Sequence, residues 1–196
     1  MKTFNTVLFD LDGTLFHSDL SFDNLRKRLG LESSEPLLEH IEKLDIEFQL
    51  QCHHAICEVE QKFAKSGSLD PIVPKLLENL RLKDIDLAIW TRNSQKATEI
   101  SLGEHIEAFD IICTRENAKA KPDPEGLYDI LRQCNCDLEQ AIFIGDSKFD
   151  VQAAQTVGIK TFILNAQLSK QLPIYDHICY MTGLEDFLEL SSKKFR

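Results

Sequence analysis

Two aspartates, separated by a single residue, follow a short apolar stretch near the start of the chain. Residues 6–9 read Thr-Val-Leu-Phe and residues 10–14 read Asp-Leu-Asp-Gly-Thr. The apolar run is typical of a buried parallel strand, and open α/β sheets bind ligands at the carboxyl ends of such strands. Paired carboxylates in that position can hold a hard cation, attack as a nucleophile or carry a proton. The plainer interpretation is a polar turn, because Asp and Gly are common in turns.

A second polar group, Thr91-Arg92-Asn93, follows the apolar residues 85–90. A hydroxyl, a guanidinium and an amide before a predicted helix would suit an anion, because free N–H groups at a helix N-terminus attract phosphate. Asn93 could equally serve as a simple helix cap. Farther along, Lys121 in a Lys-Pro-Asp-Pro loop could neutralise a phosphoryl group, although most lysines in loops are solvated.

Two more acids follow the apolar residues 141–144, in the sequence Gly-Asp-Ser-Lys-Phe-Asp. Asp146 would lie at the end of a strand, and Asp150 would share its face if a helix has already begun. Such a pair can hold Mg²⁺ directly and through water. The alternative is that Asp146 only caps the helix.

Six short apolar segments predict strands that would position these side chains. They cover residues 7–9, 85–90, 111–113, 141–144, 161–164 and 178–181. Helices are predicted near 73–82, from Asn93 or Ser94 to Gly103, from Asp123 as cap with Pro124 first, after Asp146 to Gly158, and around 184–188. This alternation predicts an α/β fold, a Rossmann-like parallel sheet core with helices on both faces. Parallel strands would then bring all four polar groups to one edge.

Residues 17–69 interrupt the alternation, because they contain no convincing strand and predict helices near 22–29, 36–50 and 52–65. We expect residues 1–16 and 70–196 to form the core and residues 17–69 to form an inserted helical cap. Additional core is the plainer alternative. A lid is favoured because loops at the carboxyl edge of a sheet form the rim of its crevice. The last residues, 191–196, are expected to fray.

Composition excludes several classes of protein. The 196 residues are 43% hydrophobic and 28% charged, as in a soluble globular protein, and the net charge of -10 argues against nucleic acid as a partner. Neither a long apolar run nor a leader is present, which predicts a cytoplasmic protein with no membrane partner and six reduced cysteines. The sequence Cys52-His53-His54 could suggest a metal cluster, but its helical apolar spacing favours packing.

Taken in order, these groups resemble the four-motif signature of the haloacid dehalogenase-like hydrolase superfamily. The match covers Asp10-x-Asp12-Gly13-Thr14, then Thr91, then Lys121-Pro122, then Gly145-Asp146-x-x-x-Asp150. The insertion resembles the first type of cap in that superfamily, and the branch resembles phosphoglycolate phosphatase and β-phosphoglucomutase. The resemblance implies an Mg²⁺-dependent phosphatase that acts on a small phosphorylated metabolite through an aspartyl phosphate.

The resemblance also implies a role for each residue. Asp10 would be the nucleophile, Asp12 the general acid and then base, Thr91 the phosphate holder and Lys121 the charge balance. Asp10, the Asp12 main-chain carbonyl and Asp146 would bind Mg²⁺, with Asp150 supporting them. The expected phosphate-binding set is Gly13, Thr14, Thr91, Arg92, Asn93 and Lys121. His17 stands where relatives often carry an acid, which weakens any transfer of phosphoglycolate specificity.

Three alternatives stay open at this point. A phosphomutase would share the first step and return the phosphoryl group to a sugar. A signalling receiver domain also uses Asp, Thr and Lys near Mg²⁺, but its acceptor follows a later strand and no helical insertion is expected. A non-catalytic family member would only bind phosphate or metal. Either a monomer or a homodimer is compatible with the sequence.

Overall fold

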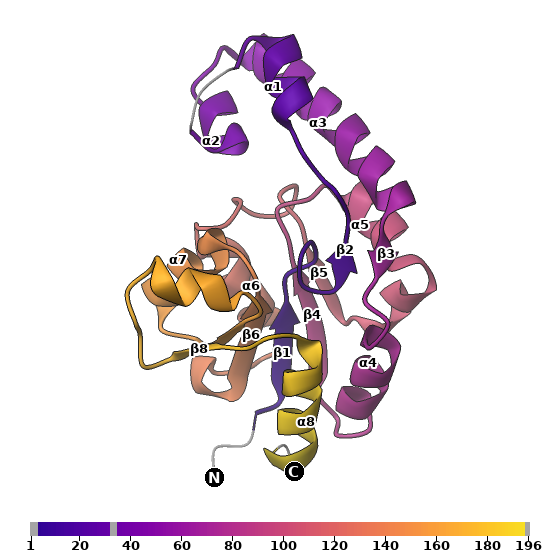
Figure 1. The fold of residues 1–196 in the computed structure, drawn as a ribbon, viewed down its shortest axis with the longest axis vertical. Helices are drawn as coiled ribbons and strands as arrows, with labels where there is room; N and C mark the ends of the chain where they lie inside the picture. The colour runs from indigo at the N-terminus through magenta and orange to yellow at the C-terminus, as the bar shows by residue number, and fades with distance from the viewer. Residues whose placement is uncertain (1–3, 32–34, 195–196) are drawn as a thin grey trace.

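The computed structural model describes residues 4–31 and 35–194, and a six-stranded parallel sheet forms its centre (Figure 1). The strand order is β5-β4-β1-β6-β7-β8, so β1 is flanked by β4 and β6. The strands are β1 (Thr6–Phe9), β4 (Asp86–Trp90), β5 (Ile111–Cys113), β6 (Ala141–Gly145), β7 (Lys160–Ile163) and β8 (Ile178–Tyr180). The predicted Rossmann-like α/β fold is confirmed, and each strand lies within about a residue of its expected position.

Alternating side chains of the central strands enter two separate apolar cores. In β1, Val7 and Phe9 pack into one core while Leu8 packs into the other. The first core is covered by α4 (Val73–Arg81), α5 (Gln95–Leu102) and α8 (Leu184–Lys194), and the second by α6 (Glu125–Gln133) and α7 (Lys148–Val157). Both faces of the sheet are therefore buried, which explains why its strands read as continuous apolar runs.

Helix termini follow the capping signals, with small shifts. Ser94 caps α5 by accepting from the N–H of Ala97, and the helix ends at Gly103 as expected. The helix α7 is capped by Ser147 and not by Asp146, and α6 begins one residue later than predicted, after Pro124. The prediction that residues 191–196 fray is wrong for residues 191–194, because α8 continues to Lys194 and buries Ser191. Residues 195–196 lie outside the described part of the chain.

Between the first two sheet strands, the chain leaves the core and forms a helical segment, residues 18–67. It contains α1 (Asp23–Leu29), α2 (Leu37–Ile41) and α3 (Ile46–Ser66), which stand above the carboxyl end of the sheet (Figure 1). Apolar side chains of these helices, Ile41, Cys52 and Ile56 among them, form a cluster of their own. Among the described residues, no helix combines the length and the apolar character that a membrane span needs.

Two features of this segment differ from prediction. The expected break near residue 51 is wrong, since α2 ends at Ile41 and α3 runs unbroken to Ser66, capped at its start by Asp45, which accepts from the N–H of Phe48. Asp45 therefore marks the start of α3, which could not be recognised from the spacing of the apolar residues. A short antiparallel ribbon, β2 (Phe16–His17) with β3 (Ser68–Leu69), joins the segment to the core where no strand was expected.

Candidate active site

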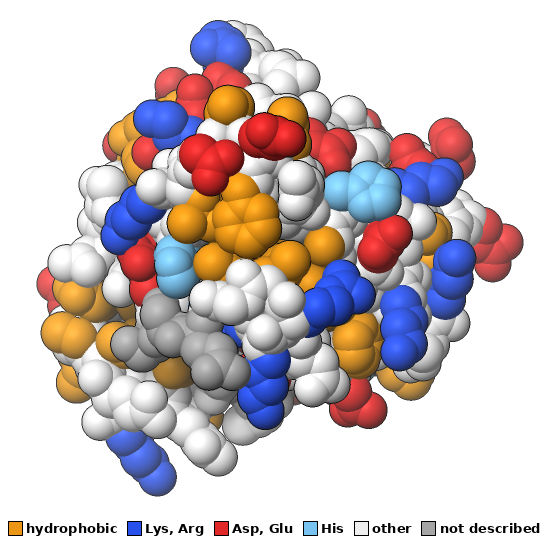
Figure 2. Space-filling model, turned by 90° about the horizontal axis from the view of Figure 1, so that it is seen from above, with side chains coloured by type: hydrophobic (Ala, Val, Ile, Leu, Met, Phe, Trp, Pro, Cys, Tyr) orange, Lys and Arg blue, Asp and Glu red, His pale blue; other side chains and the backbone are white. Residues whose placement is uncertain are grey.

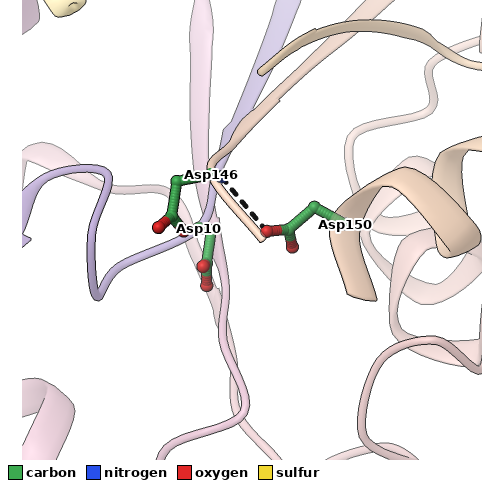
Figure 3. A group of neighbouring side chains, drawn as sticks. All are labelled: Asp10, Asp146 and Asp150. Atoms are coloured by element: carbon green, nitrogen blue, oxygen red, sulfur yellow. Dashed lines mark hydrogen bonds between the residues drawn. The ribbon is translucent and has the colours of Figure 1, made fainter. Parts of the chain in front are cut away.

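Three carboxylates meet where β1 and β6 end. Asp10 directly follows β1 and donates its N–H to the Ile144 carbonyl of β6, at 2.8 Å, while Asp146 directly follows β6. Together with Asp150 of α7, each offers one oxygen within 4.8 Å of the other two (Figure 3). The pairing of β1 with β6 thus brings together acids that are more than a hundred positions apart in the sequence.

The turn after Asp10 makes room for Asp146. Gly13 has φ +78, a conformation that residues with a Cβ rarely adopt. A Cβ at this position would lie 2.1 Å from Oδ2 of Asp146. Glycine is therefore required here both for the turn and for the close approach of the Asp146 carboxylate.

Lys121 is buried in the same cluster, with 1% of its side chain exposed. Its Nζ lies 2.6 Å from Asp10 Oδ1 and 2.8 Å from Asp150 Oδ1. Burial opposes the charged form, but the two carboxylates outweigh it and raise the pKa of Lys121 above its usual value. The lysine is therefore charged at neutral pH although it is buried, whereas the plainer interpretation of its sequence is a solvated loop lysine.

Asp150 fixes the geometry around Lys121. Its Oδ2 accepts from the N–H groups of Asp146 and Ser147, at 3.2 and 2.9 Å, and from the Ser147 hydroxyl at 2.6 Å. A Cβ on Gly145 would lie 2.6 Å from its carboxyl carbon, so the strand end also needs glycine. Asp150 is fully buried and anchors both the start of α7 and the lysine.

The cluster carries more negative than positive charge. Burial is the main cause that raises the pKa of Asp10 well above its usual value, and the charges of Asp150 and Asp146 add to it. Burial, helped by Asp150, likewise raises the pKa of Asp146 to about 7. An all-oxygen set with excess negative charge fits a hard divalent cation, which would favour the ionised carboxylates.

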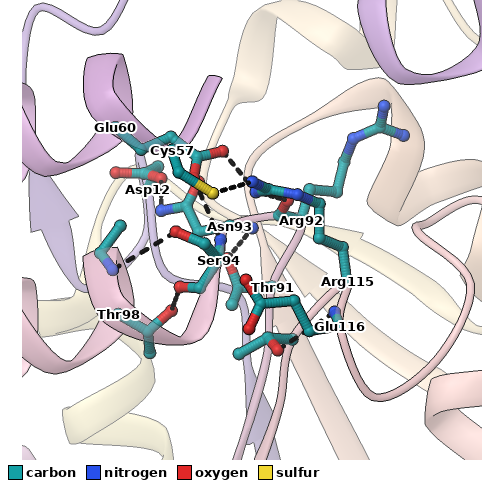
Figure 4. A network of polar contacts seen from close by, with 12 residues as sticks. Asp12, Cys57, Glu60, Thr91, Arg92, Asn93, Ser94, Thr98, Arg115 and Glu116 are labelled. Carbon is teal, nitrogen blue, oxygen red and sulfur yellow. Dashed lines mark hydrogen bonds and ion pairs between the residues drawn. The ribbon is translucent and has the colours of Figure 1, made fainter. Parts of the chain in front are cut away.

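Asp12 lies apart from this cluster and lines the neighbouring cleft. Its Oδ2 accepts a short hydrogen bond from the Asn93 side-chain amide (Figure 4). Burial raises the pKa of Asp12 to about 6, although the Asn93 bond lowers it, and the charge of Glu60 adds to the rise. A carboxyl that titrates near neutrality can both give and take a proton, and Asp12 stands outside the group of three acids that could hold a cation.

The predicted phosphate-binding residues do not all face the cluster. Thr91 is buried at the end of β4, and its hydroxyl accepts from the N–H of Asn93 at 3.2 Å. The Thr14 hydroxyl is buried without a hydrogen-bond partner in the described residues. The Arg92 guanidinium instead donates to both carboxylate oxygens of Glu39, at 2.9 and 3.0 Å. It also stacks on Phe149, 3.9 Å from the ring centre, so Arg92 links the core to α2.

A second link between the core and the helical segment was missed from the sequence. Glu60 of α3 is buried, pairs with Arg115 and accepts from the N–H of Ser94 at 3.1 Å (Figure 4). Arg115 also donates to the Arg92 carbonyl and to Cys57 Sγ, at 3.0 and 3.2 Å. One signal could have revealed it: Glu60 interrupts the buried stripe of α3 at the helical spacing of its apolar neighbours.

A cavity of about 520 Å³ lies between these links. Asp10, Asp12 and Asp146 line it from the sheet, and residues of α1, α2 and α3 line it from the other side. Seen from above, this end of the molecule shows hydrophobic side chains at its centre with charged side chains around them (Figure 2). Asp10, Asp12 and Asp146 therefore lie in a cleft large enough for a small ligand.

Comparison with known proteins relates the whole arrangement to one family. Residues 16–164 match the family model described as haloacid dehalogenase-like hydrolase, a range that begins just after Asp10 and Asp12. An uncharacterized hydrolase of Saccharomyces cerevisiae is 29% identical over 197 residues, 97% of this chain and 90% of that protein. A phosphoglycolate phosphatase of Vibrio cholerae is 29% identical over 203 residues, 89% of this chain and 90% of its own. The structure of a putative haloacid dehalogenase-like hydrolase from Bacteroides fragilis has a TM-score of 0.76, at 22% identity, over 94% of this chain and 100% of that one.

Proposed function

Because the chain belongs to the haloacid dehalogenase-like hydrolase family, in its phosphoglycolate phosphatase and β-phosphoglucomutase branch, we propose that it hydrolyses a small phosphorylated metabolite in an Mg²⁺-dependent reaction. One observation carries this proposal: Asp10, which pairs with the buried Lys121, lines the same cleft as Asp12 and Asp146. We further propose that residues 17–69 act as a cap over that cleft.

In the first step, a carboxylate oxygen of Asp10 attacks phosphorus and the ester P–O bond breaks, which leaves an aspartyl phosphate. Lys121, 2.6 Å from Asp10, offsets the repulsion between the anionic nucleophile and the anionic ester. Asp10, the Asp12 main-chain carbonyl and Asp146 would hold Mg²⁺, with Asp150 in support. The ion would supply further positive charge for the phosphoryl oxygens.

Asp12 handles the protons of both steps. In its protonated form it gives a proton to the leaving oxygen, and as a carboxylate it then takes one from the water that attacks the aspartyl phosphate. The second step releases inorganic phosphate and restores Asp10. The Asn93 amide holds Asp12 in place, and the pKa of about 6 suits a group that must change its protonation state in each cycle.

The phosphoryl oxygens would be held by the hydroxyls of Thr91 and Thr14, whereas the N–H groups of Gly13 and Thr14 donate to the carbonyls of Phe16 and Leu11. The orphan hydroxyl of Thr14 supports this assignment, because a buried hydroxyl without a partner costs free energy until a ligand accepts its hydrogen bond. Arg92 and Asn93 contribute through the loop they form, since their side chains are engaged by Glu39 and Asp12.

The proposal is tested by phosphate release from p-nitrophenyl phosphate with and without Mg²⁺. We expect Asp10→Asn to abolish turnover, because an amide does not accept the phosphoryl group, while Asp176→Asn at an exposed site keeps wild-type activity. EDTA should silence the enzyme and Mg²⁺ should restore it. Full activity of Asp10→Asn, or turnover that resists EDTA, would contradict the proposal. Conversion between sugar phosphates without release of phosphate would instead assign a phosphomutase.

A further inference from the structure

The wall of the cleft that faces the carboxylates is apolar over much of its surface. It comes from the helical segment and includes Leu20, Phe22, Pro36, Leu37, Leu38 and Ile56. Because the phosphoryl group must lie against Asp10, the remainder of the substrate must lie toward this wall. The wall therefore faces the leaving group.

The cations near the wall already have partners. Among the described residues that line the cleft, the cationic ones are Arg26 and Arg92. Arg26 donates to the main-chain carbonyl of Glu35 at 2.8 Å, and both carboxylate oxygens of Glu39 accept from Arg92. Residues 32–34 are Glu, Ser and Ser, so they contribute no cation.

The other charges on the lining are negative. Asp23 lines the cleft from α1, and Glu60 lines it from α3, where Arg115 balances its charge. A second carboxylate or phosphate on the substrate would meet mainly apolar surface and acidic side chains here, and it would have to compete with main-chain carbonyls for Arg26 and with Glu39 for Arg92. Burying such a charge without a partner is costly.

We propose that the substrate of this site is the phosphate monoester of an uncharged, largely apolar alcohol, not of a hydroxy acid or a bisphosphate. This inference rests on the proposed phosphatase function. The cavity of about 520 Å³ lies in the range that holds drug-sized ligands, and it exceeds what a two-carbon hydroxy acid needs. Each methylene that is buried against the wall contributes about 0.8 kcal/mol, a factor of roughly four in kcat/KM.

The test is a series of primary alkyl phosphates, namely ethyl, butyl and hexyl phosphate, with phosphoglycolate and glycerol 1-phosphate for comparison. Their leaving groups are all alkoxides, so differences in kcat/KM report the contacts of the leaving group. With Mg²⁺ and a phosphate-release assay, we expect kcat/KM to rise about tenfold or more from ethyl to butyl phosphate and to be lowest for phosphoglycolate. A flat series, or phosphoglycolate as the best substrate, would overturn the proposal.

A pair of variants locates the effect on the wall. Leu38→Lys introduces a cation into the lining and should raise the ratio of phosphoglycolate to butyl phosphate turnover at least tenfold. Leu50→Lys places the same charge on an exposed site of α3 and should leave the ratio unchanged. Equal ratios in the two variants would contradict the assignment of the wall, and the wild-type series decides the proposal if Leu38→Lys does not fold. Absence of phosphate release from every ester would instead contradict the phosphatase function itself.

Discussion

The helical segment touches the core through two ion pairs that differ sharply in their surroundings. Arg115 and Glu60 leave 6% and 3% of their side chains exposed, whereas Arg92 and Glu39 leave 19% and 31%. The first pair lies where α3 descends to α5, and the second lies where α2 hangs over α7 (Figure 1). The helical segment is therefore joined to the core by a buried ion pair at α3, the dry contact, and by a partly exposed ion pair at α2, the wet contact.

The difference has an energetic meaning. Breaking a buried pair leaves an uncompensated charge in the interior and costs ~3–5 kcal/mol, while an exposed pair is worth ~0–1 kcal/mol. Separation of Glu60 in α3 from Arg115 is thus too unfavourable to occur in each turnover. Separation of Glu39 in α2 from Arg92 costs little enough to occur by thermal motion. We interpret the α3 contact as the fixed side of the segment and the α2 contact as the side that opens for substrate.

The largest expected effect comes from breaking the buried pair. Arg115→Met should lower the free energy of unfolding by ~3–5 kcal/mol, because Glu60 is left buried and charged. Urea unfolding measures the loss, with Arg132→Met at an exposed ion pair as the control. The double variant with Glu60→Gln should recover part of the loss. A loss under about 1 kcal/mol would show that the two contacts do not differ as their burial indicates.

The second prediction concerns charge balance, since the Arg115–Glu60 pair is neutral and the cluster around Asp146 is not. The pKa of Asp146 is about 7 in the folded protein and 3.8 as the ordinary value, so protonation stabilises the fold at low pH. This contribution is lost as pH rises from about 4 to 7. Above pH 7, Mg²⁺ at a hundredfold excess over its Kd should restore ~2.7 kcal/mol.

Thermal unfolding with and without Mg²⁺ checks the second prediction. The gain should be larger at pH 7.5 than at pH 5 and similar in wild type and Arg115→Met, because the two sites contribute independently. Asp146→Asn should lose the gain and Asp176→Asn should keep it. A gain that disappears in Arg115→Met would instead couple the metal site to the buried pair.

The third prediction tests whether Glu60, in the α3 contact with Arg115, also affects the pKa of Asp12, the proposed proton donor. Since Asp12 must be protonated to give its proton to the leaving group, kcat should fall as pH rises through its pKa of about 6. The charge of Glu60 raises that pKa, so Glu60→Gln should move the fall to lower pH, by less than about one unit (~1.4 kcal/mol). Glu58→Gln, exposed on the same helix, should leave the profile in place. A shift toward higher pH would contradict the assignment.

The smallest effect is expected at the wet contact. Glu39→Gln should change the free energy of unfolding by less than about 1 kcal/mol, and the change should shrink at high salt. Glu189→Gln at an exposed pair of α8 provides the reference. If α2 opens for substrate, the variant should alter KM more than kcat. A loss as large as that of Arg115→Met would remove the distinction between the two contacts.

The sequence predicted the sheet well because its strands carry strong local signals. Buried apolar runs end at Asp10 and Asp146, and Ser94 and Gly103 mark the limits of α5. The ribbon of β2 and β3 was missed because strands of two residues are too short to show a periodicity. The break before α3 was misplaced because one capping side chain, Asp45, decides it.

In the candidate site too, the residues with a local sequence signal were predicted and those without one were missed. Asp10 and Asp146, which directly follow β1 and β6, could be expected to meet, because parallel strands share one edge. Arg115 and Glu60 are 55 positions apart and come from different units, so no local pattern marks their pairing. The guanidinium of Arg92 is of a type that binds anions, but in the structure it binds Glu39. Glu39 lies in the helical segment, and the apolar pattern of the sequence did not predict where that segment lies relative to the core.

The ribbon described above has a consequence for how this protein could be rebuilt. Phe16 pairs with Leu69 and His17 with Ser68, so the chain leaves and re-enters the core at adjacent points. An exchange of the segment at this ribbon must keep a carboxylate in place of Glu60, because Arg115 would otherwise stay buried without its partner. We therefore expect that grafting the corresponding segment of a relative, with that carboxylate retained, changes the choice of substrate and leaves the carboxylate cluster at the sheet edge in place.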